Sequence, residues 1–241
     1  MTETNDWAEG LEGPKKKPMK RNTKIALWLF AALVAWLTLS NASFLAPDPV
    51  GKPKLIAHRG VYHLYDKRAA AGRDTCTAQH ILPPAHQIFE NTIDSMRLAV
   101  GYDAAMVEVD VAPTKDGRMV LFHDWTVDCR TNGKGETRDL TLAELQALDI
   151  GYGYTADGGK TFPLRGKGVG KMPTVEDGLA ALPVHPILFN FKSKNAGEAD
   201  QLFAILKASG RDSAKIGDAF YGGEAPVKRM RELMPDNWAF D

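Results

Sequence analysis

Short apolar runs alternate with longer amphipathic segments along most of this chain. The short runs predict strands over residues 55–57, 106–111, 119–122, 187–191, 215–220 and 238–240. Helices are predicted over residues 91–100, 198–209 and 225–233, and after two capping-box sequences, Thr141–Glu144 and Thr174–Asp177. Strands that alternate with helices in this order predict an α/β fold with a parallel sheet.

Two histidines and two carboxylates stand at or near the ends of these predicted strands. His58 and His123 each follow a strand, whereas Glu108 and Asp110 lie within the strand over 106–111. Because side chains alternate along a strand, the two carboxylates point to the same side, and the apolar residues beside them indicate burial. Two buried carboxylates are costly unless a cation neutralises them. A divalent cation held by oxygens, Ca²⁺ or Mg²⁺ rather than zinc, together with two histidines suits phosphate-ester cleavage.

Active-site residues at strand ends are typical of a TIM (β/α) barrel, whose chemistry lies on the C-terminal face. The pattern predicts about six strands, the last of which reaches residue 240, whereas a closed barrel needs eight. A fragment or truncated reading frame would explain the difference, and so would an open doubly wound sheet. We favour a barrel truncated after about six strands, because Asp241 follows an apolar run directly.

A continuous apolar run, Ile25–Leu39, follows a cluster of lysines and arginines near the N-terminus. With residues 40–46 included, the segment reaches roughly the 20 residues that span a bilayer. A cleaved signal peptide would have a shorter charged region, and a buried core helix would not be apolar on all sides. We favour a transmembrane signal anchor that leaves the basic flank in the cytoplasm and exports the rest to the periplasm or the exterior.

These patterns divide the chain of 241 residues into four segments. They are a disordered basic cytoplasmic tail (1–24), the anchor (25–46), a linker (47–53) and a catalytic barrel domain (54–241). The formal net charge is zero, which argues against a broadly basic surface for nucleic acid.

The sequence contains two cysteines, Cys76 and Cys129. Export would place both in an oxidising compartment, where two thiols can pair. A bridge between them would stabilise the fold by about 4 kcal/mol in the chain-entropy model. It would also fasten two loops that follow histidine-bearing strands. We favour pairing; two unrelated buried thiols are the alternative, because sequence alone does not set their separation.

An ordered set of short motifs resembles the glycerophosphodiester phosphodiesterase family. In chain order the motifs are Ala57–Gly60, Phe89–Thr92, Glu108–Asp110, Thr114–Gly117, Phe122–Asp124, Arg130–Gly135 and Leu145–Gly151. Each motif alone is weakly specific, but the ordered set between residue 55 and about residue 194 is strong. The resemblance implies a TIM barrel, a bound divalent cation and hydrolysis of glycerophosphodiesters to sn-glycerol 3-phosphate and an alcohol.

The resemblance implies that His58 and His123 are the general acid and base, and that Glu108 and Asp110 are metal ligands. The family usually has a third carboxylate ligand where this chain has Asn190. The amide oxygen of an asparagine can bind Ca²⁺ or Mg²⁺, but the site then has one negative charge fewer than with a carboxylate. We therefore expect weaker cation binding. We expect activity to be retained because both histidines and both carboxylates are present; a site silenced by Asn190 is the alternative.

Substrate binding is assigned by the same resemblance to Arg59, Lys192 and Glu90. Arg59 would contact the phosphate, Lys192 matches a family lysine, and Glu90 would support its neighbours in the site. The long polar excursion over residues 125–172, together with residues 61–89, would wall the pocket and select the alcohol group.

The leading interpretation is therefore a membrane-anchored, exported glycerophosphodiesterase. A lysophospholipase D or sphingomyelinase-D-like enzyme would use the same histidines and cation on a lipid held near the anchor, such as a lysophospholipid. A non-catalytic binding module is a third possibility, supported by Asn190 and the early end of the strand pattern. The glycine-rich stretch over 166–171 is not a phosphate-binding P-loop, because Met172 stands where serine or threonine is needed.

Overall fold

The computed structural model describes residues 19–42, 51, 53–69 and 75–241. The chain divides into two units, Met1–Lys52 and Pro53–Asp241. In the first unit the described part is mainly one helix, α1 (Arg21–Ser40), which has no buried residues. By length and composition α1 can cross a membrane, and a signal sequence near the N-terminus would meet the same test.

The helix α1 differs from the predicted anchor at both ends. It begins at Arg21, four residues before residue 25. The Lys24 amide donates to the Lys20 carbonyl at 3.1 Å, because basic side chains do not prevent the backbone hydrogen bonds of a helix. It ends at Ser40 rather than at residue 46. Residues 1–18 of the predicted tail, 43–46 of the anchor and most of the linker lie outside the described residues.

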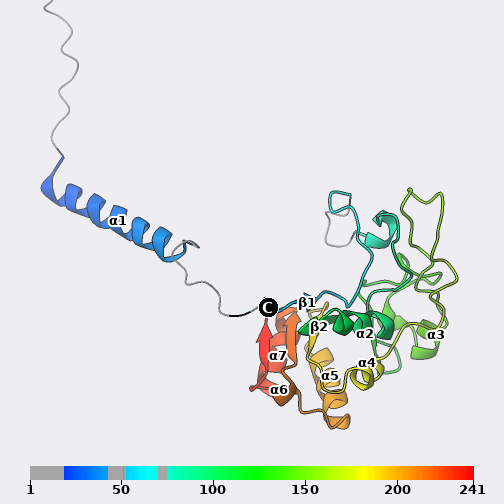
Figure 1. Ribbon diagram of the computed structural model, residues 1–241. Coiled ribbons are helices and arrows are strands. Elements are labelled where there is room, and N and C mark those ends of the chain that lie inside the picture. Colours follow the sequence, from blue (N-terminus) through cyan, green and yellow to red (C-terminus); the bar gives the residue numbers. More distant parts are fainter. Residues whose placement is uncertain (1–18, 43–50, 52, 70–74) are drawn as a thin grey trace, which may run out of the picture. The chain divides into compact units, whose positions relative to one another are not determined.

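A six-stranded sheet organises the second unit (Figure 1). Its strands are β1 (Ile56–Ala57), β2 (Met106–Pro113), β3 (Met119–Leu121), β4 (Ile187–Phe191), β5 (Ala219–Gly222) and β6 (Trp238–Phe240). The order is β1-β2-β4-β5-β6 with every neighbouring pair parallel, which confirms the predicted parallel sheet. Strands are added on one side without reversal, as in a β/α barrel and unlike a doubly wound sheet.

The strand β3 stands apart from this parallel order because it pairs with β2 in the antiparallel sense. The turn over residues 114–118 returns the chain directly onto β2, whereas a parallel connection needs a crossover of about a dozen residues or more. Five of the six predicted strands therefore follow the order of a barrel, and β3 extends β2 as a hairpin.

Helices connect the parallel strands. They are α2 (Ile93–Gly101), α3 (Leu142–Gln146), α4 (Val175–Ala181), α5 (Gly197–Ala208), α6 (Ser213–Ile216) and α7 (Glu224–Leu233), with short 3-10 turns η2 (Thr77–His80) and η3 (Thr137–Asp139). Both predicted capping boxes are confirmed at the starts of α3 and α4, and Thr92 forms a third at the start of α2.

One predicted strand, over residues 215–220, begins too early. The Asp212 side chain accepts from the Lys215 amide at 3.1 Å and starts α6, and Gly217, at φ 93°, ends it. The strand β5 therefore begins at Ala219 and reaches Gly222, two residues beyond the predicted end.

The main core lies between the sheet and the helices α2, α4, α5 and α7 (Figure 1). Val107, Val109 and Val111 of β2 belong to this core. Glu108 and Asp110 alternate with them and point to the opposite face of the sheet. The predicted alternation thus places apolar side chains on the helix-covered face and both carboxylates on the other.

A second core joins the two long segments at the carboxyl ends of the strands. The Phe89 and Tyr154 rings pack edge to face with centroids 5.7 Å apart. The Thr155 amide donates to the Ala78 carbonyl at 3.0 Å. The segments over 61–89 and 125–172 therefore pack on each other as one layer instead of forming separate loops.

Candidate active site

Strand register places three polar side chains in one row. Asp110 of β2 is level with Asn190 of β4, which is level with Tyr221 of β5. Glu108 precedes Asp110 by two residues and shares its face of the sheet. Glu108 and Asp110 are 2% and 0% exposed. The predicted pair of buried, same-facing carboxylates is present in the structure.

Glu108 is held at both carboxylate oxygens. The Arg59 amide donates to its Oε2 at 2.7 Å, and the Tyr221 hydroxyl donates to its Oε1 at 2.6 Å. Burial, followed by the nearby charge of Asp110, raises the pKa of Glu108 to about 7. A positive charge between these carboxylates would therefore be strongly favoured.

Asn190 contributes its amide nitrogen to the same space. Its Nδ2 donates to Asp110 Oδ1 at 2.8 Å and to Glu108 Oε1 at 3.2 Å. It also lies 2.9 Å from the Tyr221 hydroxyl. A neutral amide donor therefore joins the two carboxylates at the position where the family that the chain resembles usually has a third carboxylate.

Two residues with left-handed backbone conformations complete this side of the site. Arg59 and Asn91 both have φ near 56°. The conformation of Arg59 aims its amide at Glu108, and Asn91 exchanges two hydrogen bonds of 2.9 Å with Asp110, one from Nδ2 and one to Oδ1. Next to Arg59, Gly60 lies against the backbone of Ser95, so a side chain there has no room.

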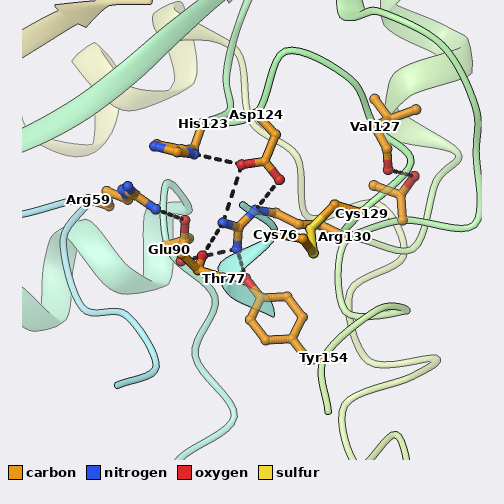
Figure 2. Close-up of a disulfide and its surroundings, with 11 residues drawn as sticks. Arg59, Cys76, Thr77, Glu90, His123, Asp124, Val127, Cys129, Arg130 and Tyr154 are labelled. Atoms are coloured by element: carbon orange, nitrogen blue, oxygen red, sulfur yellow. Dashed lines mark hydrogen bonds and ion pairs between the residues drawn. A yellow bond between two sulfur atoms is a disulfide. The ribbon is translucent and has the colours of Figure 1, made fainter. Parts of the chain in front are cut away.

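Glu90 lies between two arginines. Its Oε1 accepts from Arg59 at 2.8 Å, and its Oε2 is 3.2 Å from Arg130 Nη1 (Figure 2). Burial would raise the pKa of Glu90, but the charges of Arg130 and Arg59 outweigh it and lower the pKa. Both oxygens of Glu90 therefore contact arginine side chains of the protein, Arg59 on one side and Arg130 on the other.

His123 is held at both ring nitrogens. Its Nδ1 is 2.6 Å from Asp124 Oδ1, and its Nε2 is 3.1 Å from Lys192 Nζ. Lys192 Nζ is also 3.6 Å from Asp110 Oδ1, which links the histidine to the buried carboxylates. Burial would raise the pKa of Asp124, but Arg130 and His123 reverse the effect and hold it well below its usual range.

His58 lies just past β1, on the exposed side of the site. Its ring meets the Tyr62 ring edge to face, with centroids 5.4 Å apart. Partial removal from water and the positive charge of Arg59 lower the pKa of His58, while Asp110 acts in the opposite direction. The structure thus groups the predicted histidines, carboxylates and basic residues where β1, β3 and β4 end, beside Glu108 and Asp110 in the middle of β2.

A disulfide joins Cys76 to Cys129, with their Cα atoms 5.7 Å apart. It borders a cavity of about 310 Å³ that is also lined by His123, Lys192 and Trp125. The cavity is large enough for a small alcohol group beside the histidine.

The donor set at Glu108, Asp110 and Asn190 fits a hard divalent cation, because it offers buried carboxylates and an amide on one face. Asn190 would have to present Oδ1 in place of Nδ2. Among the described residues no group of three or more histidine, cysteine, aspartate or glutamate side chains forms a metal site, so the amide would be needed to complete the set.

Sequence reasoning did not assign roles to Asn91, Tyr221 and Arg130. Asn91 and Arg130 both lie within motifs that carry the family resemblance, so their motif positions were the available signal. Tyr221 could have been found from strand register, had the fifth strand been extended past residue 220.

Comparisons with known proteins identify the family. The model of the glycerophosphoryl diester phosphodiesterase family matches residues 58–207, more than half of the 241 residues. The chain belongs to this family. The glycerophosphodiester phosphodiesterase of Bacillus subtilis is 34% identical over 125 residues, which cover 48% of this chain and 41% of that protein. That of Caldanaerobacter subterraneus is 48% identical over 65 residues, 27% of each protein. The matched regions thus cover less than half the length of these two curated relatives.

Solved structures share the fold. A glycerophosphoryl diester phosphodiesterase domain from Mycobacterium tuberculosis gives a TM-score of 0.56 at 20% identity, covering 78% of this chain and 59% of that one. A phosphodiesterase from Oleispira antarctica, solved in complex with the product sn-glycerol-3-phosphate, gives 0.53 at 22% identity, covering 76% and 63%. At these identities the similarity establishes the fold alone.

Proposed function

We propose that this chain is a glycerophosphodiester phosphodiesterase that releases sn-glycerol 3-phosphate and an alcohol. The observation that carries the proposal is the grouping of His58 and His123 with Glu108, Asp110 and Lys192 at one end of the sheet, within the matched family region. The product bound to the Oleispira antarctica neighbour supports the choice of substrate.

In the proposed reaction the glycerol hydroxyl next to the phosphate attacks phosphorus, and the bond to the alcohol oxygen breaks. One histidine accepts the proton of the attacking hydroxyl, and the other gives a proton to the leaving alkoxide. Water then opens the cyclic phosphate, so that the net reaction adds one water molecule across the ester bond. Arg59 and Lys192 supply positive charge toward the phosphate oxygens.

A divalent cation would be held by Glu108, Asp110 and Asn190, and it would supply Lewis-acid stabilisation of the phosphate oxygens. Ca²⁺ and Mg²⁺ both suit this oxygen donor set. Supporting observations are the complete burial of Asp110 and the hydrogen bonds that fix Glu108 at both oxygens.

We further propose that α1 anchors the protein in a membrane and that the catalytic unit is exported. The apolar length of α1, the basic residues before and within its first turn, and the disulfide support this topology. Resistance of the membrane fraction to alkaline extraction, together with protease access to the catalytic unit from outside spheroplasts, would support it. Release of the protein by washing, or protection of the catalytic unit, would contradict it.

The test of activity is release of sn-glycerol 3-phosphate from glycerophosphocholine by the full chain, with Ca²⁺, with Mg²⁺ and with EDTA. We expect EDTA to abolish turnover, and His58→Ala and His123→Ala to lower it by about 100-fold or more. His80→Ala is the matched control. Turnover of lysophosphatidylcholine alone would favour a lipid phosphodiesterase, and no turnover of either substrate by the folded protein would favour a binding module.

A further inference from the structure

A series of contacts leads from His123 to the disulfide (Figure 2). His123 Nδ1 is 2.6 Å from Asp124 Oδ1, and Arg130 Nε donates to Asp124 Oδ2 at 2.8 Å. The side chains of Asp124 and Arg130 are 16% and 3% exposed. Arg130 Nη2 also donates to Asp124 Oδ1 at 3.4 Å, so Arg130 contacts both carboxylate oxygens, and a rotation of the carboxylate would disturb its contacts with Arg130 and with His123. The orientation of His123 therefore depends on where Arg130 lies.

The terminal nitrogens of Arg130 also have other partners. Its Nη2 donates to Thr77 Oγ1 at 2.7 Å, and its Nη1 donates to the Tyr154 hydroxyl at 2.8 Å. Glu90 Oε2 lies 3.2 Å from the same Nη1. A guanidinium is a rigid planar fork, so partners on several sides fix its position and its tilt together.

The Cys76–Cys129 disulfide lies next to these contacts. Cys76 directly precedes Thr77, and Cys129 directly precedes Arg130. The disulfide therefore joins the two backbones next to the residues that form the hydrogen bond from Arg130 to Thr77. Apart from the disulfide, a side-chain hydrogen bond from Arg130 Nη2 to Thr77 Oγ1 joins these two residue pairs. The bridge therefore limits how far Thr77 can move away from Arg130.

We propose that Arg130 is a positioning residue for His123, and that the Cys76–Cys129 disulfide together with Thr77 holds it in place. Arg130 acts through Asp124, which keeps the imidazole proton on Nδ1 and presents Nε2 toward Lys192 and the substrate. The inference rests on the proposed function only in giving His123 an acid–base role.

Reduction supplies a reversible way to loosen this support. A dithiol reductant transfers two electrons and two protons to the disulfide, which becomes two thiols while the dithiol becomes a cyclic disulfide. The hydrogen bond between Thr77 and Arg130 is then left without its covalent support.

The first readout is the tautomer of His123, measured from the ring-nitrogen chemical shifts of the full chain in detergent, with His123→Gln used to assign the signals. We expect the Nδ1–H tautomer in the oxidised protein. We expect a mixture of tautomers after reduction, in Cys76→Ser/Cys129→Ser and in Thr77→Val. Thr155→Val is the matched control, because Thr155 is also buried and its hydroxyl hydrogen-bonds Asp157 instead.

The second readout is steady-state kinetics. We expect Arg130→Lys to lower kcat by about 100-fold and Thr77→Val by about tenfold, with KM changed less than kcat, because a misplaced acid–base group slows the chemical step. Thermal unfolding will show whether Arg130→Lys is folded; if it is not, Thr77→Val and reduction carry the test.

An unchanged His123 tautomer in Thr77→Val and in the reduced protein would overturn the proposal. So would equal losses of kcat in Thr77→Val and Thr155→Val. If the wild-type protein shows no turnover, the proposed function fails, but the tautomer readout still decides whether Arg130 positions His123.

Discussion

Asn190 is level with Asp110 across the β2–β4 pair and donates a 2.8 Å hydrogen bond from Nδ2 to Asp110 Oδ1. The same nitrogen lies 3.2 Å from Glu108 Oε1. The amide therefore stabilises the two buried carboxylates when no cation lies between them. When a cation is present, however, the neutral amide offers it one negative charge fewer than a carboxylate at this position would.

This relationship predicts opposite effects of Asn190→Asp with and without a cation. In EDTA the variant should be less stable by about 3 kcal/mol, because a third buried carboxylate replaces a hydrogen-bond donor. With Ca²⁺ or Mg²⁺ the loss should shrink, because cation affinity rises with the charge of the ligands. Urea unfolding in the two conditions measures both effects.

The control for this prediction is Asn195→Asp, which adds the same charge at an exposed position. It should change stability by less than about 0.5 kcal/mol in either condition. If Asn190→Asp were as stable as the wild-type protein in EDTA, Asn190 would not have the stabilising role that its hydrogen bonds indicate.

Tyr221 provides a second test of the carboxylate site. Tyr221→Phe removes the hydroxyl that donates to Glu108 Oε1 at 2.6 Å and keeps the ring that stacks on Phe240. We expect a loss of about 2 kcal/mol in the free energy of unfolding, since a buried carboxylate oxygen loses a partner. Tyr102→Phe, at an exposed position, is the control and should have little effect. Equal stability of the two variants would show that the hydroxyl contributes nothing measurable.

The sequence was sufficient to predict the elements that are determined by local patterns. Glu108 and Asp110 alternate with valines, so their shared face follows from strand geometry alone. The capping boxes at Thr141 and Thr174 likewise depend on residues three positions apart. The ordered motifs also identified the family before any geometry was known.

Contacts between distant segments were not predictable in the same way. Tyr221 reaches Glu108 from 113 residues away because two strand registers place it beside Asn190. The contact of Arg130 with Thr77 depends on the packing of two long segments without regular periodicity, and its contact with Tyr154 lies within one of them. The strand predicted over 215–220 begins too early for a local reason, because the Asp212 cap and Gly217 bound a short helical turn, Ser213–Ile216, just before β5.

Gly60 should tolerate no side chain, because a Cβ there would lie 2.8 Å from the Ser95 carbonyl carbon and 2.6 Å from its Oγ. Gly60 also has φ 71°. We expect Gly60→Ala to lower the free energy of unfolding by about 3 kcal/mol and to lower activity, because relief of the clash moves the neighbouring Arg59 and His58.

Gly117→Ala is a matched control, since its φ of 76° is similar and its Cβ would meet open space. It should cost about 1 kcal/mol through backbone strain alone. Similar costs for the two variants, measured by urea unfolding, would contradict the importance of the Ser95 contact.

His63 predicts a loss of stability in mild acid. Its side chain is buried against His86, Phe89 and Tyr154, and burial followed by the charge of His86 lowers its pKa from 6.5 to about 4. Between these two values the unfolded chain binds a proton that the folded chain does not, so stability falls as the pH is lowered through this window. The stability that a neutral, buried His63 contributes is complete above the pKa of the unfolded chain and is lost near the pKa of the folded chain. The free energy of unfolding differs by about 3 kcal/mol between these two limits. His63→Phe keeps an aromatic ring and removes the titration. Urea unfolding across the window should therefore show a steeper decline for the wild-type protein than for the variant, and parallel declines would contradict the burial of a neutral His63.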